Sequence, residues 1–353
     1  MKKIKFIFGL LFVALNCLAQ DPQFTQFYAA PLYHNPAFTG GGYAPRVMFN
    51  YRNQWPSLNA NFITSLVSID HFIEKANSGI GITLLNDEQG NRLKNTEVTA
   101  LYSYQLQIGQ KNFLRMGLQG SYSTRGFDPS GLTFGDQFNN SGFTGAPSSD
   151  PFADKGNFQT SRKFDVGSGV LFYNPRAFIG VSMHHINRPT LTFNTNTTPS
   201  PGCVTGDCIP RKFMVNGGLN IPLNNAYSGA GNSDKEFVIT PTFLYKKQGQ
   251  FSQLDMGAYV TYTPLTLGLW YRGIPLKKLF SDKFPNQDAL AALVGFRFEN
   301  FSVGYSYDLT ISGLGASSGG SHEISISYQL DKFDKESSPY KRQRKKELAC
   351  PKF

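Results

Sequence analysis

The chain has 353 residues and a formal net charge of +10, with 16% charged residues, 14% aromatic residues and 35 glycines. So small a charged fraction counts against a soluble α/β enzyme, in which about a quarter of the residues are charged. It suits an all-β membrane protein with aromatic girdles. No segment after residue 19 reaches the roughly 18 consecutive apolar residues that a membrane helix needs, so a bilayer would be crossed by strands.

The first 19 residues have the three parts of a secretory signal peptide. Lysines precede a short apolar core over residues 4–15, and small residues follow in Cys17-Leu18-Ala19, so cleavage is expected before Gln20. Lipoprotein processing at Cys17 is the alternative. Asn16 counts against it, because a small residue is needed just before the lipidated cysteine.

Residues 20–44 form a segment before the first strand that is rich in aromatic residues, proline and asparagine. Its aromatic side chains would be costly to leave in water, so we expect it to pack at the periplasmic mouth of a barrel or in the lumen. Two roles stay open, a plug that stops leakage and a segment that binds a partner. The aromatic residues concerned are Phe24, Phe27, Tyr28, Tyr33 and Phe38.

Alternation and turn residues predict a transmembrane antiparallel β-barrel of about 14 strands over residues 45–330. The clearest strands are 301–309 and 322–330, in which apolar and polar side chains alternate and so face lipid and lumen in turn. Strand 61–70 mixes its faces, and Pro241 suggests that 236–246 is edge-like or bulged. The other strands are predicted at 46–54, 78–86, 95–108, 113–125, 163–173, 176–184, 211–221, 251–262, 265–272 and 289–299.

The predicted connections alternate in length. Those on one side are tight, at 109–112, 174–175, 263–264 and 300, and those on the other are long, at 126–162, 186–210, 273–288 and 310–321. Bacterial outer-membrane barrels have short periplasmic turns and long outer loops, so the loops are expected at the cell surface. By parity, residues 20–44 and the C-terminus both fall on the periplasmic side. The longer periplasmic connection 222–235 is either a partner contact or a flexible turn.

Charged residues are predicted in the lumen, where they must pair or stay hydrated. They fit a charge ladder that braces the barrel, or a polar cavity that receives a partner's peptide, and a solute pore would be lined in the same way. The predicted lumen residues are Arg46, Arg52, Glu97, Arg115, Asp165, Asp255, Arg297, Asp308 and Glu323.

The last residues, 331–353, form a basic tail with eight Lys or Arg against four acids. Such a tail can meet an acidic periplasmic protein or anionic lipid headgroups, and the export signal makes nucleic acid an unexpected partner. The residues expected to make this contact are Arg342, Arg344, Lys345, Lys346, Cys350 and Phe353.

Two cysteines, Cys203 and Cys208, lie in one polar loop and are expected to form a local disulfide in an oxidising compartment. A metal site at this C-x₄-C spacing is the alternative, but it lacks further ligands nearby. Cys350 is the odd cysteine. We expect no metal and no cofactor.

Two N-terminal motifs carry a resemblance to a known family. DPQFTQFY (residues 21–28), followed by NPAFTG (35–40), resembles the opening of the PorP/SprF family, and YRNQWP (51–56) resembles its first strand. The ending CPKF (350–353) is similar to a family ending, and the resemblance spans the mature chain. It implies an outer-membrane component of the type IX secretion system and, in gliding species, of the gliding machinery.

The resemblance also implies a role and partners. Such a protein helps secrete an adhesin and anchors it at the cell surface, so the expected partners are the adhesin's C-terminal domain, periplasmic or outer-membrane components of the system, and outer-membrane lipid. It would be an adaptor rather than a pore. The motif residues expected to contact a partner are Phe24, Phe27, Tyr28, Asn35, Pro36 and Phe38.

Two other functions were weighed. A porin or FadL-like uptake channel would need an open lumen. A hydrolase would need a nucleophile and base, but the five histidines are scattered and no G-x-S-x-G motif has a matching context. His184 and His185 are adjacent, so on a strand they face opposite ways and cannot share a site. We expect no enzymatic activity.

Overall fold

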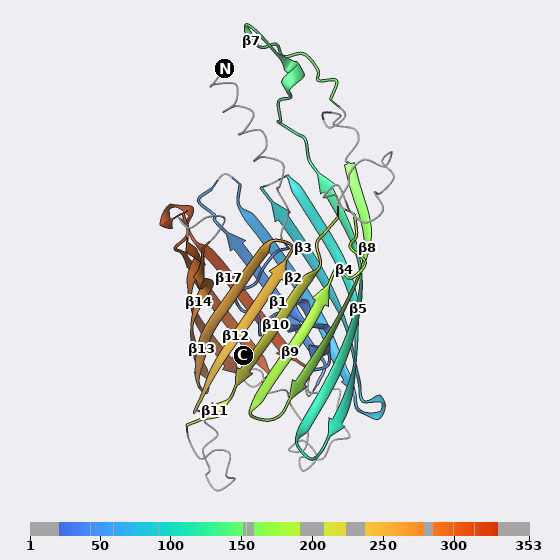
Figure 1. The fold of residues 1–353 in the computed structure, drawn as a ribbon, viewed down its shortest axis with the longest axis vertical. Coiled ribbons are helices and arrows are strands. Elements are labelled where there is room, and N and C mark those ends of the chain that lie inside the picture. The colour runs from blue at the N-terminus through green and yellow to red at the C-terminus, as the bar shows by residue number, and fades with distance from the viewer. Residues whose placement is uncertain are drawn as a thin grey trace.

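The computed structural model is a closed barrel of antiparallel strands, which confirms the predicted all-β fold (Figure 1). The sheet has 15 strand segments, and two of them, β10 and β11, occupy one wall position in succession, so the barrel has 14 strands. The predicted signal peptide and basic tail lie outside the residues that the structure describes. These are residues 21–42, 44–58, 60–90, 92–150, 153, 159–190, 208–223, 237–278, 285–298, 300–313 and 315–330.

The wall strands lie side by side in chain order, and the pairing of β1 with β17 closes the barrel. The predicted strands coincide with them and differ mainly at the ends. The wall consists of β1 (Arg46–Gln54), β2 (Phe62–Ile73), β3 (Ser78–Gln89), β4 (Leu93–Ile108), β5 (Asn112–Phe127), β8 (Gln159–Tyr173), β9 (Ala177–His184), β10 (Lys212–Leu219), β11 (Ile221–Pro222), β12 (Phe237–Gln248), β13 (Phe251–Tyr262), β14 (Leu265–Lys278), β15 (Pro285–Phe298), β16 (Phe301–Thr310) and β17 (Ser321–Gln329).

Pro241 lies in β12, which has partners on both sides, so the prediction of an edge-like or bulged strand is wrong. On one side β12 pairs with β13 without a break, and Pro241 is opposite Ala258. On the other side it pairs with β10 as far as Thr242 and with β11 from Ile239. Because proline has no N–H to give to the ladder, the neighbouring strand is interrupted at this point without a change of register.

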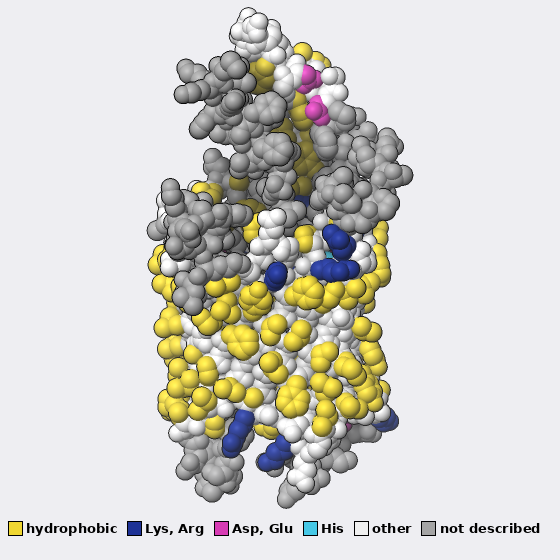
Figure 2. All heavy atoms as spheres, viewed as in Figure 1, with side chains coloured by type: hydrophobic (Ala, Val, Ile, Leu, Met, Phe, Trp, Pro, Cys, Tyr) yellow, Lys and Arg dark blue, Asp and Glu magenta, His cyan; other side chains and the backbone are white. Residues whose placement is uncertain are grey.

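The outer face of the barrel is a band of hydrophobic side chains, with Lys and Arg beyond it at both ends (Figure 2). Leu118 and Phe164 are among the exposed residues, and Leu269 is 72% exposed. Soluble proteins rarely expose so large an apolar surface, whereas a barrel in a bilayer presents one to the lipid tails. Within the described ranges, no helix is long and apolar enough to cross a membrane.

The two ends of the barrel differ in their connections. Tight turns join β4 to β5, β8 to β9 and β13 to β14 at one end, which we call the short-turn end. Long connections lead from β5 to β8 and from β9 to β10 at the other, the long-loop end. There a hairpin of β6 (Phe138–Asn139) and β7 (Gly142–Phe143) extends away from the wall (Figure 1).

The predicted alternation of connection lengths is incomplete at the long-loop end. The turns after β3 and β12 are tight, with Gly90 and Gly249 at positive φ. The loop predicted at 273–288 is largely strand, because β14 continues to Lys278 and β15 begins at Pro285. Residues 273–278 and 285–288 of the predicted loop therefore belong to the wall.

Candidate functional site

The N-terminal segment lies inside the barrel, and we call residues 21–42 the plug. It contains α2 (Pro31–His34) and η1 (Pro36–Phe38), each with a proline in its first turn, where the missing N–H breaks no helical hydrogen bond. Asn35 joins the two helices. Its side chain accepts a hydrogen bond of 2.9 Å from the N–H of Ala37, which caps η1.

The plug runs through the lumen from the long-loop end to the short-turn end. At the long-loop end of β10, the Lys212 ammonium donates to the Asp21 carboxylate at 2.6 Å. Toward the short-turn end of β2, the N–H of Gly40 donates to Asp70 at 2.8 Å. Strand parity predicts the side of the membrane on which β1 begins, but it does not predict the position of Asp21. The expectation that the whole segment lies on the same side as the tail does not hold for the start of the plug, which lies at the long-loop end.

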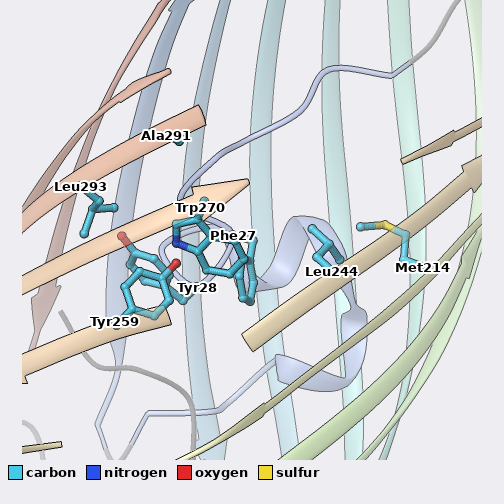
Figure 3. Packing of buried hydrophobic residues seen from close by; sticks show 8 residues of the cluster. All are labelled: Phe27, Tyr28, Met214, Leu244, Tyr259, Trp270, Ala291 and Leu293. Atoms are coloured by element: carbon cyan, nitrogen blue, oxygen red, sulfur yellow. The ribbon is translucent and has the colours of Figure 1, made fainter. Parts of the chain in front are cut away.

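Phe27 and Tyr28 are the centre of a buried aromatic cluster between the plug and the wall (Figure 3). The Phe27 ring meets Trp270 of β14 edge to face at 5.1 Å, and the Tyr28 ring meets Tyr259 of β13 at 4.7 Å. Burial of each such side chain contributes about 1.5–3 kcal/mol, and each aromatic pair adds about 0.5–1.5 kcal/mol. The wall completes the cluster with Met214, Leu244, Ala291 and Leu293.

Apolar wall residues that point inward pack on the plug, which explains the strand whose faces looked mixed. Leu66 of β2 and Leu85 of β3 contact Phe24 and Ala30, and Phe24 is 0% exposed. The strand therefore alternates regularly, with Leu66 on the same inward face as its polar neighbours. An apolar group belongs on that face here because the plug, and not water, covers it.

Two inward-facing glycines let the plug backbone lie directly on the wall. A Cβ at Gly169 of β8 would lie 2.0 Å from Oδ1 of Asn35, and one at Gly117 of β5 would lie 2.3 Å from the nitrogen of Ala37. Distances this short are incompatible with any side chain larger than hydrogen. The Asn35–Pro36 turn of the plug and the glycines of the wall therefore fit each other.

A buried network of charges ties Thr25 of the plug to four strands, β1, β14, β16 and β17. The Thr25 hydroxyl donates to Asp308 at 2.6 Å and accepts from Arg52 at 2.7 Å and from Arg272 at 2.8 Å. Arg52 and Arg272 also bond to Asp308, at 2.8 and 2.9 Å. Glu323 accepts from Arg52 at 3.1 Å and from the backbone N–H of Thr25 at 2.7 Å. Every charge in this network has a partner, as burial requires.

Arg272 was not among the predicted lumen residues, whereas Arg52, Asp308 and Glu323 were. Its signal in the sequence was its place on the inward face of 265–272, at the last predicted residue of that strand. The guanidinium also lies 3.4 Å from Asp255, so it bridges Asp255 of β13 and Asp308 of β16.

Asp255 joins this network through Arg272, and the other predicted lumen residues lie apart from it. Arg46 pairs with Asp70 at 3.0 Å, and Arg115 donates to the carbonyl of Thr39 at 3.0 Å, so both secure the end of the plug. Glu97 accepts from Thr99 at 3.2 Å. The backbone N–H of Arg297 bonds to Pro264 at the short-turn end.

His184 and His185 both point into the lumen, so the expectation that they face opposite ways is wrong. β9 ends at His184, and His185 has φ of 57°, a left-handed conformation that breaks the alternation. The His184 ring lies 3.0 Å from the carbonyl of His34. The His185 ring lies 2.8 Å from Asp21 and 2.8 Å from Asp165. Sequence adjacency alone could not show this turn.

A family model described as "Type IX secretion system membrane protein PorP/SprF" matches residues 16–328. The chain belongs to this family. The match covers the plug and the whole described wall. It therefore confirms the resemblance that the motifs at 21–28, 35–40 and 51–56 suggested.

Solved structures similar to this PorP/SprF protein include an outer membrane protein and two toluene transporters. Omp33 of Acinetobacter baumannii is 8% identical, with a TM-score of 0.40, and the match covers 83% of this chain and 100% of Omp33. The Ralstonia pickettii toluene transporter TbuX is 10% identical, with a TM-score of 0.45, over 85% of this chain and 93% of the transporter. The Pseudomonas putida toluene transporter TodX is 9% identical, with a TM-score of 0.44, over 84% and 92%. No curated protein matches the chain.

The family motifs fall on the contacts between plug and wall. Asn35 donates to the carbonyls of Val170 and Val181, each at 3.3 Å, and Phe38 packs on Phe178. The motif at 51–56 supplies Arg52 to the charge network. The predicted contact residues Phe24, Phe27, Tyr28, Asn35, Pro36 and Phe38 are thus all buried inside the barrel.

The remaining predicted sites are only partly described. Cys208 is disulfide-bonded, and its expected partner Cys203 lies outside the described residues. The predicted tail contacts Arg342, Arg344, Lys345, Lys346, Cys350 and Phe353 also lie outside them. Among the residues that are described, no group of three or more His, Cys, Asp or Glu is placed to hold a metal ion.

A cavity of about 520 Å³ lies at the long-loop end of the lumen, and we call it the mouth cavity. The start of the plug forms one side of it, and the ends of wall strands form the rest. Its lining includes Asp21, Gln23, Tyr33, Trp55, Lys212 and Lys246. Below it, Phe27 and Tyr28 of the plug pack against Tyr259 and Trp270 of the wall (Figure 3).

Proposed function

We propose that this barrel is an outer-membrane component of the type IX secretion system that helps export a partner adhesin and anchors it at the cell surface. Family membership supports a role in secretion. The observation that carries the adaptor role is the plug, whose side chains are buried across the lumen. The protein keeps the permeability barrier while its two ends serve partners on either side of the membrane.

The plug argues against the alternative, a porin or FadL-like uptake channel. A solute pore needs a continuous open path, but Phe27 and Tyr28 pack on the wall at the middle of the lumen and Thr25 is held by charged wall residues. Opening this path would expose the aromatic cluster and leave buried charges unpaired, which is strongly unfavourable. In this proposal the aromatic residues of the motif hold the barrel closed, and they do not contact a partner directly.

The lengths of the connections support an orientation for this component. The long-loop end faces the cell exterior and presents the mouth cavity and the β6–β7 hairpin to the adhesin, as in other outer-membrane barrels. The short-turn end and the tail face the periplasm. Arg342, Arg344, Lys345 and Lys346 there meet an acidic component of the secretion or gliding machinery.

Affinity purification from outer membranes, followed by mass spectrometry, tests the adaptor role. The wild-type barrel is expected to bring down a large surface protein and a periplasmic component. Truncation of residues 331–353 is expected to keep the barrel and the surface protein but lose the periplasmic component. A wild-type barrel that brings down neither contradicts the proposal.

Conductance across planar bilayers tests the closed lumen. The wild-type barrel is expected to show no steady ion current, and deletion of residues 23–38 is expected to open a conducting path. Steady wild-type conductance, together with no surface partner, would instead favour an uptake channel.

A further inference from the structure

Two family motifs that are far apart in the sequence meet at the mouth cavity. Asp21 and Gln23 come from the plug, and Gln54 and Trp55 from the end of β1. We propose that the mouth cavity binds a short, extended, uncharged polypeptide segment of the secreted partner. The proposal rests on the proposed function and names the site at which that partner is held.

The position and size of the cavity fit a segment that enters without passing through. The cavity lies at the long-loop end, and Pro22 and Tyr33 of the plug contribute to its lining. Its volume of about 520 Å³ falls in the range of ligand sites, about 300–1,000 Å³. A sphere of this volume is about 10 Å across, the length of about three extended residues.

Amide side chains dominate the polar lining. A glutamine side chain has two N–H donors and a carbonyl acceptor, the groups that a peptide backbone needs. Four of the lining glutamines already have hydrogen bonds within the protein, Gln248 with Asp21, Gln253 with Asp255, Gln23 with Lys246 and Gln54 with Arg52, so each of these offers a ligand only its remaining N–H or lone pair. The amide groups that remain give the cavity both donors and acceptors for a peptide backbone. The lining glutamines are Gln23, Gln54, Gln248, Gln253 and Gln287.

The charges around the cavity already have partners, which favours an uncharged ligand. Lys212 is bonded to Asp21 at 2.6 Å. Lys246 donates to Gln23 at 3.2 Å and lies 3.9 Å from Asp255. A charged ligand would have to break these pairs or stay unpaired in a confined space, at a high cost.

Trp55 is held in the cavity wall by an unusual backbone. Its φ is 57°, although it is a bulky residue that precedes proline, and such residues avoid this region. Its N–H bonds to the carbonyl of Gly320 at 2.8 Å, and its ring meets Phe62 at 5.6 Å. Backbone strain of this kind is typical of binding sites, and here it sets an aromatic surface at the rim.

The aliphatic lining favours a peptide over a glycan. Pro22, Met214 and Ile311 line the cavity beside the aromatic residues. Such groups receive apolar side chains, and methionine adapts to their shape. A glycan covered with hydroxyl groups would leave them without suitable contacts.

Photo-cross-linking in intact cells tests the proposal. A photoreactive residue replaces Phe251 or Gln287 in the full-length barrel, and the matched control replaces Gln107, an exposed glutamine near the short-turn end. The expected result is a cross-link from 251 and from 287 to one stretch of a few residues in a secreted protein. The control is expected to give no such cross-link.

A charge substitution provides a second measurement. Gln287→Glu places a carboxylate at the cavity beside Asp288, and it is expected to reduce the retained partner about tenfold or more, as loss of a central interface contact does. Gln107→Glu makes the same chemical change at the other end and is expected to leave retention unchanged.

The outcomes separate this proposal from the proposed function. If the wild-type barrel retains a surface protein, but neither position cross-links to a short stretch of it, the site is wrong and the adaptor role stands. Displacement of the partner by neutral surface glycans would also overturn the peptide site. If no surface protein is retained at all, both proposals fail.

Discussion

Thr25 of the plug donates a hydrogen bond of 2.6 Å from its hydroxyl to Oδ2 of Asp308 in β16. The Thr25 hydroxyl oxygen also accepts from Arg52 and Arg272 of the wall, so this small side chain uses all its hydrogen-bonding capacity inside the barrel. The wall network is therefore complete only when the plug is in place. Plug insertion and the stability of the charged wall are consequently coupled.

Arg272→Met tests this coupling. The substitution leaves Asp308 and Asp255 short of one buried partner each, and removal of one member of a buried ion pair costs about 3–5 kcal/mol. The midpoint of urea unfolding in detergent, followed by tryptophan fluorescence, should fall accordingly. The matched control is Lys94→Met, because Lys94 pairs with Glu88 at 3.5 Å in an exposed position. It should cost at most about 1 kcal/mol. Equal midpoints for the two variants would contradict a stabilising role for the network.

Gly169→Val should displace the plug. Its Cβ would lie 2.0 Å from Oδ1 of Asn35, so the Asn35–Pro36 turn cannot keep its place on β8. We expect a loss of about 1–3 kcal/mol, typical of overpacking, and faster proteolysis within residues 21–42. Gly120→Val is the control, because the nearest atoms to a Cβ there are those of the Phe164 ring at 3.5 Å. If residues 21–42 are equally resistant to proteolysis in both variants, the close fit at Gly169 does not hold the plug in place.

The sequence was sufficient for the wall of the barrel. In β16 and β17, apolar and polar side chains alternate with a period of two, as expected for strands with lipid on one side and polar groups on the other. This pattern allowed the strands and their pairing to be predicted. The apparent exceptions, such as Leu66, are inward-facing apolar residues that the plug covers. An inward apolar residue is explained only when the segment that covers it is known, and alternation alone does not supply that segment.

The candidate site was harder to predict because it depends on where the plug meets the wall. Arg52, Asp308 and Glu323 could be assigned to the lumen from their strands, but their common partner Thr25 is 283 residues from Asp308 and 298 from Glu323 in the chain. Parity predicts the direction of strands only, so it could not predict the path of the plug. The inward turn of His185 depends on one backbone angle, which no pattern in the sequence predicts.

Acidification should open the loop between β5 and β8. A hydrogen bond from the Ser148 side chain, and then one from the Ser149 N–H, holds the pKa of Asp136 below its ordinary value. Because the pKa is depressed in the folded state, the hydrogen bonds from Ser148 and Ser149 to Asp136 hold the loop closed above the ordinary carboxyl pKa of about 3.9. They are lost as the pH falls through the depressed value. Cleavage of the loop by an acid-tolerant protease should therefore increase only below about pH 4. Asp136→Asn should increase cleavage already at neutral pH, and Ser141→Ala should not. A pH-independent cleavage rate would count against this closure.

Phe27→Ala tests how much the aromatic cluster contributes to the closed state. The substitution removes the ring that meets Trp270 at 5.1 Å and leaves a cavity in the middle of the lumen, where the described wall and plug otherwise pack closely. Large-to-small changes of this kind cost about 3–5 kcal/mol. The expected results are a lower unfolding midpoint, altered Trp270 fluorescence and intermittent ion current. Phe164→Ala removes the same ring from the outer face, where Phe164 is exposed toward lipid, so it should change neither the current nor the Trp270 signal. A current that appears equally in both variants would mean that the cluster does not hold the plug in place.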